Sequence, residues 1–285
     1  MGWASAYSER TSPRDDHALL ALHLSAAYIR INDPTVALNR LPKEASMKYT
    51  AKVLGREAKA GQLMVLRLER PAGFDYKAGQ FCFVNAPDIG LSDAGGLRRP
   101  LSLATSPLEK DLLFTVRLSE SAFKRTLREM ADTSAVVIES AMGLFTLPAD
   151  KSTPLCFLAG GMGIAPFRSM LRYAADARTG HKATLFYSSR VPEEALFLDE
   201  FNSIASKDPS IQVVATITRP EQSAQEWEGR TGRLAASAIK ETCAYWKEAI
   251  YYLAGPPVMV DGMKTMLDEM GIDKARIKQE VWTGY

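Results

Sequence analysis

Three glycines, Gly160, Gly161 and Gly163, separate an apolar run from a segment with helical spacing. Glycine lets the backbone turn sharply and lets a pyrophosphate approach the N–H groups. The start of the following helix adds unpaired N–H donors and the positive end of the helix dipole. Pro166 is tolerated in the first helical turn because its missing N–H would have no helical partner. The expected nucleotide-binding turn comprises Gly160, Gly161, Gly163, Ile164, Ala165 and Pro166. The alternative is that these glycines serve only close packing of the helix on the strand.

Hydroxyls and arginines follow the next two expected strands. A site for NAD often ends its second strand with Asp or Glu, which binds the ribose hydroxyls, whereas this chain has Tyr187-Ser188-Ser189-Arg190 there. Hydroxyl and guanidinium groups suit a 2′-phosphate through charge-assisted bonds. We therefore expect NADPH rather than NADH, with ordinary surface arginines as the alternative. The candidate residues are Ser189, Arg190, Thr218, Arg219, Arg230 and Arg233.

The stretch Arg99-Pro100-Leu101-Ser102-Leu103-Ala104-Thr105-Ser106 places an arginine and a hydroxyl three residues apart beside an expected strand. A guanidinium pairs well with a phosphate, and a serine hydroxyl both donates and accepts hydrogen bonds. The alternatives are that Arg99 forms a surface ion pair and that Ser102 caps a turn.

The number and spacing of the cysteines and histidines limit which cofactors the chain can bind. Iron–sulfur clusters of the ferredoxin kind need four closely patterned cysteines, and this chain has Cys82, Cys156 and Cys243 far apart. We therefore expect any one-electron acceptor to be a separate molecule. Few, scattered cysteines favour buried free thiols and a reducing, cytoplasmic compartment. The histidines show no metal-ligand spacing, so no metal site is expected.

From Met47 onward, short β-like runs separated by turns predict an antiparallel β-barrel. The expected strands are Tyr49–Leu54, Leu63–Leu68, Phe81–Asn85, Leu101–Thr105, Leu112–Arg117 and Val136–Glu139. Helical spacing of apolar residues predicts a helix over Ser121–Met130.

After residue 150, apolar strands alternate with helices, which predicts a parallel sheet covered on both faces. The expected strands are Pro154–Ala159, Thr184–Ser188, Ile211–Thr216, Ile250–Ala254 and Ile277–Trp282. The expected helices are Phe167–Ala177, Pro192–Ser203, Ala235–Glu241 and Val258–Met270.

The 285 residues are enough for two domains, and we expect them at 47–150 and 151–285, after an N-terminal extension, 1–46, of unknown role. Apolar residues make up 46% and charged residues 24%, as in soluble globular proteins. The formal charge of +2 is too small to indicate nucleic-acid binding. No apolar run reaches the length of a membrane span.

Four segments in register resemble the ferredoxin–NADP reductase superfamily over roughly residues 47 to 285. They are Arg99–Ser106, Gly160–Pro166, Ala254-Gly255-Pro256-Pro257 and Glu280-Val281-Trp282. The family fold is a flavin-binding antiparallel barrel followed by a nicotinamide-binding parallel sheet. That fold agrees with the independent reading of the strand and helix pattern.

The resemblance implies a role for each matching residue. Arg99 would pair with the flavin pyrophosphate, and Ser102 would lie near flavin N5. Glu280 would support hydride or proton movement, and Trp282 or Tyr285 would cover the flavin face opposite the barrel. The remaining residues implied at the flavin and nicotinamide are Pro100, Leu101, Val116, Arg117, Phe123, Lys124, Arg125, Thr126, Gly255 and Pro256. Two of these residues also have a plainer interpretation. Glu280 would be a solvated acid at a strand end, and Trp282 would pack in the core.

Three positions depart from the family pattern. Leu101 replaces the usual tyrosine, Lys124 stands where serine or threonine is expected, and Ala254 replaces a frequent cysteine. These changes indicate reduced rates rather than a dead site.

The resemblance implies an FAD enzyme in which hydride passes from NAD(P)H to the flavin and electrons then leave singly. The expected acceptor is a protein such as ferredoxin or flavodoxin. One alternative is the reductase component of an oxygenase, or an NAD(P)H-dependent reductase of small acceptors. Another is a non-catalytic nucleotide-binding module that senses redox state.

Overall fold

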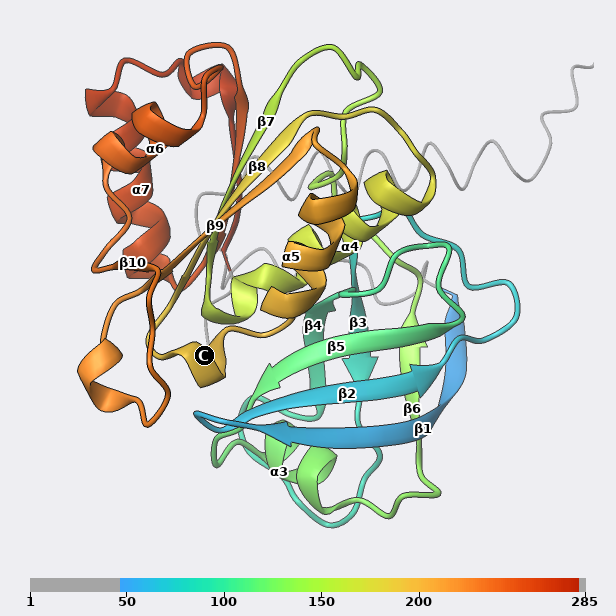
Figure 1. The fold of residues 1–285 in the computed structure, drawn as a ribbon. Helices are drawn as coiled ribbons and strands as arrows, with labels where there is room; N and C mark the ends of the chain where they lie inside the picture. Colours follow the sequence, from blue (N-terminus) through green and yellow to red (C-terminus); the bar gives the residue numbers. More distant parts are fainter. Residues whose placement is uncertain (1–46, 282–285) are drawn as a thin grey trace, which may run out of the picture. The chain divides into compact units, whose positions relative to one another are not determined.

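The computed structural model describes residues 47–281, whose strands form one antiparallel and one parallel sheet of six strands each (Figure 1). The expected extension 1–46 lies outside the described residues, as do Trp282 and Tyr285. The predicted fold class, an antiparallel barrel followed by a parallel α/β sheet, is confirmed.

The antiparallel sheet has the strand order β4-β3-β6-β1-β2-β5. Its strands are β1 (Lys48–Lys59), β2 (Leu63–Glu69), β3 (Phe81–Asn85), β4 (Arg98–Ser102), β5 (Asp111–Arg117) and β6 (Ala135–Glu139). The sheet closes into a barrel, in which the two ends of the strand order, β4 and β5, meet. The backbone N–H of Ala104, just after β4, donates a 2.9 Å hydrogen bond to the carbonyl of Leu113 on β5. Apolar side chains such as Leu66, Val84 and Phe114 fill the interior.

Strand β4 begins three residues earlier than expected and ends at Ser102 instead of Thr105. It is an edge strand of the ladder, which is where a strand tolerates the missing N–H of Pro100. Beyond Ser102 the chain leaves the ladder, and the carbonyl of Thr105 accepts a hydrogen bond from Ser169. Arg99 and Ser102 therefore lie within a strand rather than beside one.

The parallel sheet has the order β10-β9-β8-β7-β11-β12. Its strands are β7 (Leu155–Gly160), β8 (Ala183–Ser189), β9 (Ile211–Ile217), β10 (Arg230–Thr231), β11 (Ile250–Gly255) and β12 (Ile277–Val281). Helices α4 (Ile164–Asp176) and α5 (Leu198–Lys207) pack on one face through residues such as Phe167 and Phe201. Helices α6 (Ala236–Thr242) and α7 (Pro257–Glu269) cover the other face (Figure 1).

Several predicted elements need correction. The expected helix Pro192–Ser203 is broken, because Phe197 adopts a left-handed backbone with φ of 63° between the short 3-10 turn η2 (Pro192–Glu194) and α5. Helix α4 begins at Ile164, three residues before the expected start, so the glycine turn leads into it directly. The two-residue strand β10 carries no recognisable strand pattern. The expected helix at Ser121–Met130 is α3 (Ala122–Glu129).

All three cysteines are buried and free, as predicted for Cys82 and Cys156. Within residues 47–281, no helix combines the length and apolar character needed to cross a membrane.

Candidate functional site

The glycine turn lies where the strand order of the parallel sheet reverses. Strand β7 pairs with β8 on one side and β11 on the other, and ligands of such sheets bind beyond the carboxyl ends at this point. Gly160 ends β7 and Gly255 ends β11. A Cβ on Gly163 would lie only 2.3 Å from the carbonyl oxygen of Ala254. Two of the predicted segments, the Gly160 turn and the Ala254–Pro257 segment, are therefore packed directly together.

Close packing explains some of these glycines but not all. A Cβ on Gly163 would meet the backbone of β11, so packing requires glycine there. A Cβ on Gly160 would meet the Met259 sulfur at 1.9 Å, but this flexible side chain can shift. Gly161 differs, because its φ is +52° and a Cβ there would meet nothing within 4 Å. This open face, next to the start of α4, can admit a phosphate group. The turn, as η1 (Gly161–Gly163), also has Cα atoms within 8 Å of barrel strand β5.

A polar pair joins the barrel to the parallel sheet. Ser102 Oγ donates a 2.9 Å hydrogen bond to Glu280 Oε2. Glu280 is 7% exposed and pairs with Ala254 in the β11–β12 register, beside the second glycine segment. The interpretation of Glu280 as a solvated strand-end acid is therefore wrong. The two residues expected at the hydride-transfer position lie together, one from each sheet.

Three of the predicted cations gather around the start of α3. Burial lowers the pKa of Lys124, and the positive charges of Arg99 and Arg117 lower it further. Arg99 donates to the carbonyls of Gly95 and Gly96 and lies 5.7 Å from the Phe123 ring centroid. Two carboxylates already face the cluster, because Arg117 Nη2 lies 3.7 Å from Glu194 Oε2, and the Ala122 N–H and the charge of Arg99 both lower the pKa of Asp93. A diphosphate would add negative charge between the three cations.

Buried hydroxyls at α3 also fit a polar ligand. Among the described residues, Ser121 Oγ and Thr126 Oγ1 are buried without a hydrogen-bond partner. The backbone N–H of Ala122 donates a 2.6 Å bond to Asp93 Oδ2, and this bond is the main cause of the lowered pKa of Asp93. The hydroxyls of Ser121 and Thr126 and the N–H of Ala122 thus suit the phosphates of FAD. Of these three donors, the Ala122 N–H binds Asp93.

The other residues implied at the flavin contribute packing or surface pairs. Val116 and Phe123 place their side chains in the barrel core, and Leu101 packs against that core from β4. Pro100 lies in β4 opposite Phe83. Arg125 forms an ion pair with Glu129 at 3.4 Å.

The residues expected at a 2′-phosphate are brought together only in part. Thr218 Oγ1 donates to the carbonyl of Ser189 at 3.2 Å, so the ends of β8 and β9 are adjacent. Arg190, however, donates to both carboxylate oxygens of buried Glu194, at 2.6 and 3.0 Å. Arg230 pairs with Glu241 at 3.1 Å. Within the described part of the chain, Arg219 and Arg233 form no ion pair.

The two residues implied at the nicotinamide lie at the carboxyl end of β11, where Gly255 is the last residue of the strand and Pro256 follows it.

A cavity of about 970 Å³ lies away from these residues. It is bounded by β1, β2 and β5 on one side and by η2, the start of α5 and Gln225–Trp227 on the other. None of the predicted site residues lines it, so this cavity is distinct from the glycine turn.

Sequence reasoning missed several residues at the site. Arg168 and Ser169 bind backbone of the Arg99–Ser106 stretch, Asp93 binds the α3 start, and Met259 covers Gly160. A charged residue within the apolar helix α4 was the available signal for Arg168. Asp93 and Met259 carry no motif that would have indicated them.

A family model and several curated relatives match this chain. Residues 157–265 match the model of the oxidoreductase NAD-binding domain. Oxidoreductase NAD-binding domain-containing protein 1 of Pongo abelii is 31% identical, and the match covers 92% of each chain. The terephthalate 1,2-dioxygenase reductase component 2 of Comamonas sp is 25% identical over 90% of this chain and 74% of its own.

Solved structures share the fold. A ferredoxin NADP+ reductase from Neisseria gonorrhoeae, with bound FAD and NADP, superposes with a TM-score of 0.66 at 22% identity, covering 82% of this chain and 98% of that one. The ferredoxin reductase in carbazole 1,9a-dioxygenase gives 0.69 at 23% identity, covering 85% and 70%. With its barrel, its parallel sheet and its glycine turn, this chain belongs to the oxidoreductase NAD-binding domain proteins and has the fold of ferredoxin–NADP reductases.

Proposed function

We propose that this protein is an FAD-dependent oxidoreductase that passes electrons between NAD(P)H and a one-electron protein acceptor. The observation that carries the proposal is the hydrogen bond between Ser102 and Glu280. It places a hydroxyl of the barrel and a carboxyl of the parallel sheet together, beside the second of the two glycine segments. Two cofactor sites on separate sheets would meet at this point.

Ser102 and Glu280 are suited to hold and move a proton. Because Ser102 Oγ donates its proton to Glu280 Oε2, its lone pairs remain able to accept a hydrogen bond from a ligand. A proton accepted at Oγ can be matched by one delivered to Oε2, so the pair forms a short relay away from the barrel edge.

FAD, when bound, supplies the hydride chemistry and the ability to release electrons singly. Arg99, Lys124 and Arg117 would hold its phosphates by charge, and Ser121 and Thr126 would add hydroxyl groups. Asp93 would have to release the N–H of Ala122 if a phosphate takes that donor. The protein thus contributes orientation, electrostatics and the proton relay of Ser102 and Glu280.

The nicotinamide nucleotide would bind across the carboxyl ends of β7 and β11, with its pyrophosphate against the open face of Gly161. We favour NADPH, because hydroxyls and arginines rather than an acid follow β8 and β9. Arg219 would bind the 2′-phosphate, and Arg190 would join it only after leaving Glu194.

The acceptor is proposed to be a small electron carrier such as ferredoxin or flavodoxin. An oxygenase component is a second candidate, which the similarity to the reductase component of terephthalate 1,2-dioxygenase supports. Buried free cysteines support a reducing, cytoplasmic location.

Stopped-flow spectroscopy under anaerobic conditions tests the proposal. The purified protein is mixed with NADPH or NADH, and then with ferredoxin, flavodoxin or an oxygenase component. The proposal predicts loss of the flavin absorbance on the first mixing and its return on the second. A protein whose bound flavin is not reduced by either nucleotide would instead be a binding module.

A further inference from the structure

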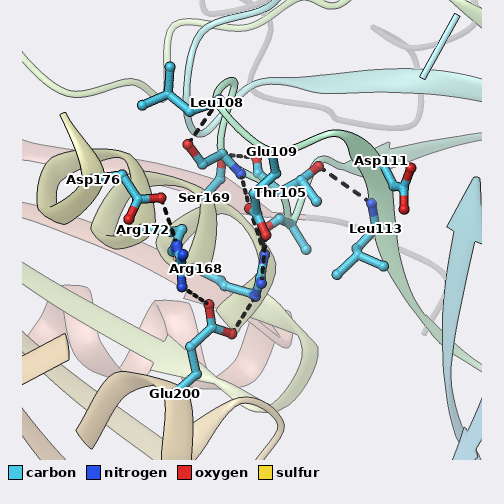
Figure 2. Close-up of polar contacts among 12 residues, drawn as sticks. Thr105, Leu108, Glu109, Asp111, Leu113, Arg168, Ser169, Arg172, Asp176 and Glu200 are labelled. Carbon is cyan, nitrogen blue, oxygen red and sulfur yellow. Dashed lines mark hydrogen bonds and ion pairs between the residues drawn. The ribbon is translucent and has the colours of Figure 1, made fainter. Parts of the chain in front are cut away.

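A buried polar cluster outside the predicted site centres on Arg168, in the second turn of α4 (Figure 2). Its side chain is 7% exposed and reaches from the parallel sheet's helix layer to the barrel. Its Nη1 donates a 2.8 Å hydrogen bond to the carbonyl of Ala104, two residues after Ser102. A buried arginine with a partner on the other sheet joins the two halves of the site directly.

A carboxylate from the barrel completes this contact. Glu109, between β4 and β5, accepts from Arg168 Nη1 at 3.1 Å and from Nη2 at 3.0 Å. The same carboxylate accepts a 2.6 Å bond from the backbone N–H of Ser106. Glu109 is therefore fixed to the stretch that carries Arg99 and Ser102, and its fork-to-fork geometry with the guanidinium defines direction as well as distance.

On its other edge the guanidinium is anchored within the parallel-sheet half. Arg168 Nε donates a 2.7 Å bond to Glu200 on α5, and the guanidinium carbon lies 4.9 Å from the Phe197 ring centroid. Burial alone would lower the pKa of Arg168, but Glu109 and Glu200 outweigh that effect and raise it. The charge is thus permanent and its orientation is set from both sides.

The next residue adds a second tie. Ser169 Oγ donates a 2.5 Å hydrogen bond to the carbonyl of Thr105 and accepts a 3.3 Å bond from the N–H of Gly79. Figure 2 shows Ser169 beside Thr105 and Arg168 between Glu109 and Glu200. Consecutive carbonyls of the Arg99–Ser106 stretch are therefore held by consecutive residues of α4.

We propose that Arg168, clamped by Glu109, is a positioning residue that sets the separation between the flavin-binding stretch and the glycine turn. The inference rests on the proposed function. Ala104 is two residues, about 7 Å of extended chain, from Ser102. Arg168 is five helical positions, about 7.5 Å, from Gly163. Such short connections leave little slack, and hydride transfer is steep in distance, with about 1 Å of misplacement costing about a hundredfold.

Two variants and a matched control test the clamp. Arg168→Met removes every bond of the guanidinium, and Glu109→Gln removes the charge but keeps an acceptor for Ser106. Arg172→Met is the control, because Arg172 lies on the same helix and shares Glu200 with Arg168, but forms no hydrogen bond or ion pair with the barrel in the described part of the chain. We expect hydride transfer to fall about tenfold to a hundredfold in the first two, with flavin content and the nucleotide dissociation constant unchanged. The control should keep its rate.

A distance measurement supplies a readout independent of turnover. Lys52 on β1 and Lys274 near β12 have side chains that are 76% and 85% exposed, and the native cysteines are buried. Spin labels on Lys52→Cys and Lys274→Cys would report the separation of the two sheets by pulsed electron paramagnetic resonance. The clamp predicts a broadened or shifted distance distribution in Arg168→Met and a narrow one in Arg172→Met.

Unchanged rates and distances in both clamp variants of a yellow protein would overturn this inference and leave the proposed function standing. An equal loss of rate in Arg172→Met would overturn it as well, because the effect would then not need the barrel contact. A colourless wild-type protein would instead overturn the proposed function and this inference with it.

Discussion

Ser102 and Glu280 are 178 positions apart in the sequence, yet Ser102 Oγ donates directly to Glu280 Oε2 at 2.9 Å. The bond forms because β4 is the edge strand of the barrel and β12 is the edge strand of the parallel sheet. It is the contact on which the hydride-transfer geometry of the proposal depends.

Ser102→Ala should slow hydride transfer from NADPH by about a hundredfold while leaving bound flavin in place, because the variant removes a hydroxyl that moves a proton but no phosphate contact. Stopped-flow absorbance measures the rate. Ser152→Ala is the matched control, since Ser152 only binds Asp150 at the surface. Equal rates in wild type and Ser102→Ala would contradict the role.

Glu280→Gln should produce a similar loss, and the double variant with Ser102→Ala should be no slower than the slower single variant. When two residues act as one unit, removing either abolishes the unit, so the rate losses of the two single variants do not add in the double variant. The same stopped-flow measurement provides the cycle. Additive losses would show that the two side chains act independently.

Glu194→Gln should raise the kcat/KM ratio of NADPH to NADH by about tenfold, because freeing Arg190 from a buried carboxylate makes a guanidinium available to the 2′-phosphate. Glu194 Oε2 also lies 3.7 Å from Arg117 Nη2, so the two rates are compared at equal flavin content. Binding of 2′,5′-ADP and AMP by calorimetry gives a readout without turnover. Glu69→Gln, which loosens only the surface pair with Lys52, should change neither ratio. A ratio that stays constant in Glu194→Gln would remove Arg190 from the nucleotide site.

Gly161→Ala and Gly163→Ala should separate binding from packing. At Gly163 a methyl group meets backbone of β11, so the free energy of unfolding should fall by about 1–3 kcal/mol. At Gly161 space is open, so the left-handed backbone costs only about 1 kcal/mol, but the methyl group occupies the face offered to the pyrophosphate. Denaturant unfolding and nucleotide titration measure the two effects. Unaltered nucleotide affinity in Gly161→Ala would place the phosphate elsewhere.

Acid should weaken the barrel through Glu139. Arg98 donates two 2.7 Å bonds to this carboxylate and Asn85 donates a third. Burial raises the pKa of Glu139, but these donors outweigh it and hold the pKa below its ordinary value of 4.5. The stabilisation is therefore fully present above 4.5 and is lost as the pH falls through the lower folded pKa. Unfolding of wild type and Glu139→Gln as a function of pH should converge in acid, and parallel curves would contradict this assignment.

The fold was largely predictable because its signals are local. The apolar run of β7 and the glycines after it identify strand, turn and helix without tertiary information. The break at Phe197 was not predictable, since an aromatic residue in a left-handed conformation is imposed by its surroundings.

The site residues that belong to sequence motifs were predictable. The contacts between side chains from distant parts of the chain were not. Ser102 and Glu280 were both expected, but their direct bond depends on how the two sheets meet. The pairing of Arg190 with Glu194 and the capture of the α3 N–H by Asp93 join residues with no motif between them. Arg168 was missed because its partners come from a distant loop and strand end.

The absorbance spectrum of the purified protein, with mass identification of any released cofactor, tests the central claim most directly. The account predicts a yellow protein that releases FAD in an amount equimolar with the chain and bleaches when NADPH is added without oxygen. A folded protein that is colourless and fails to take up added FAD would contradict it.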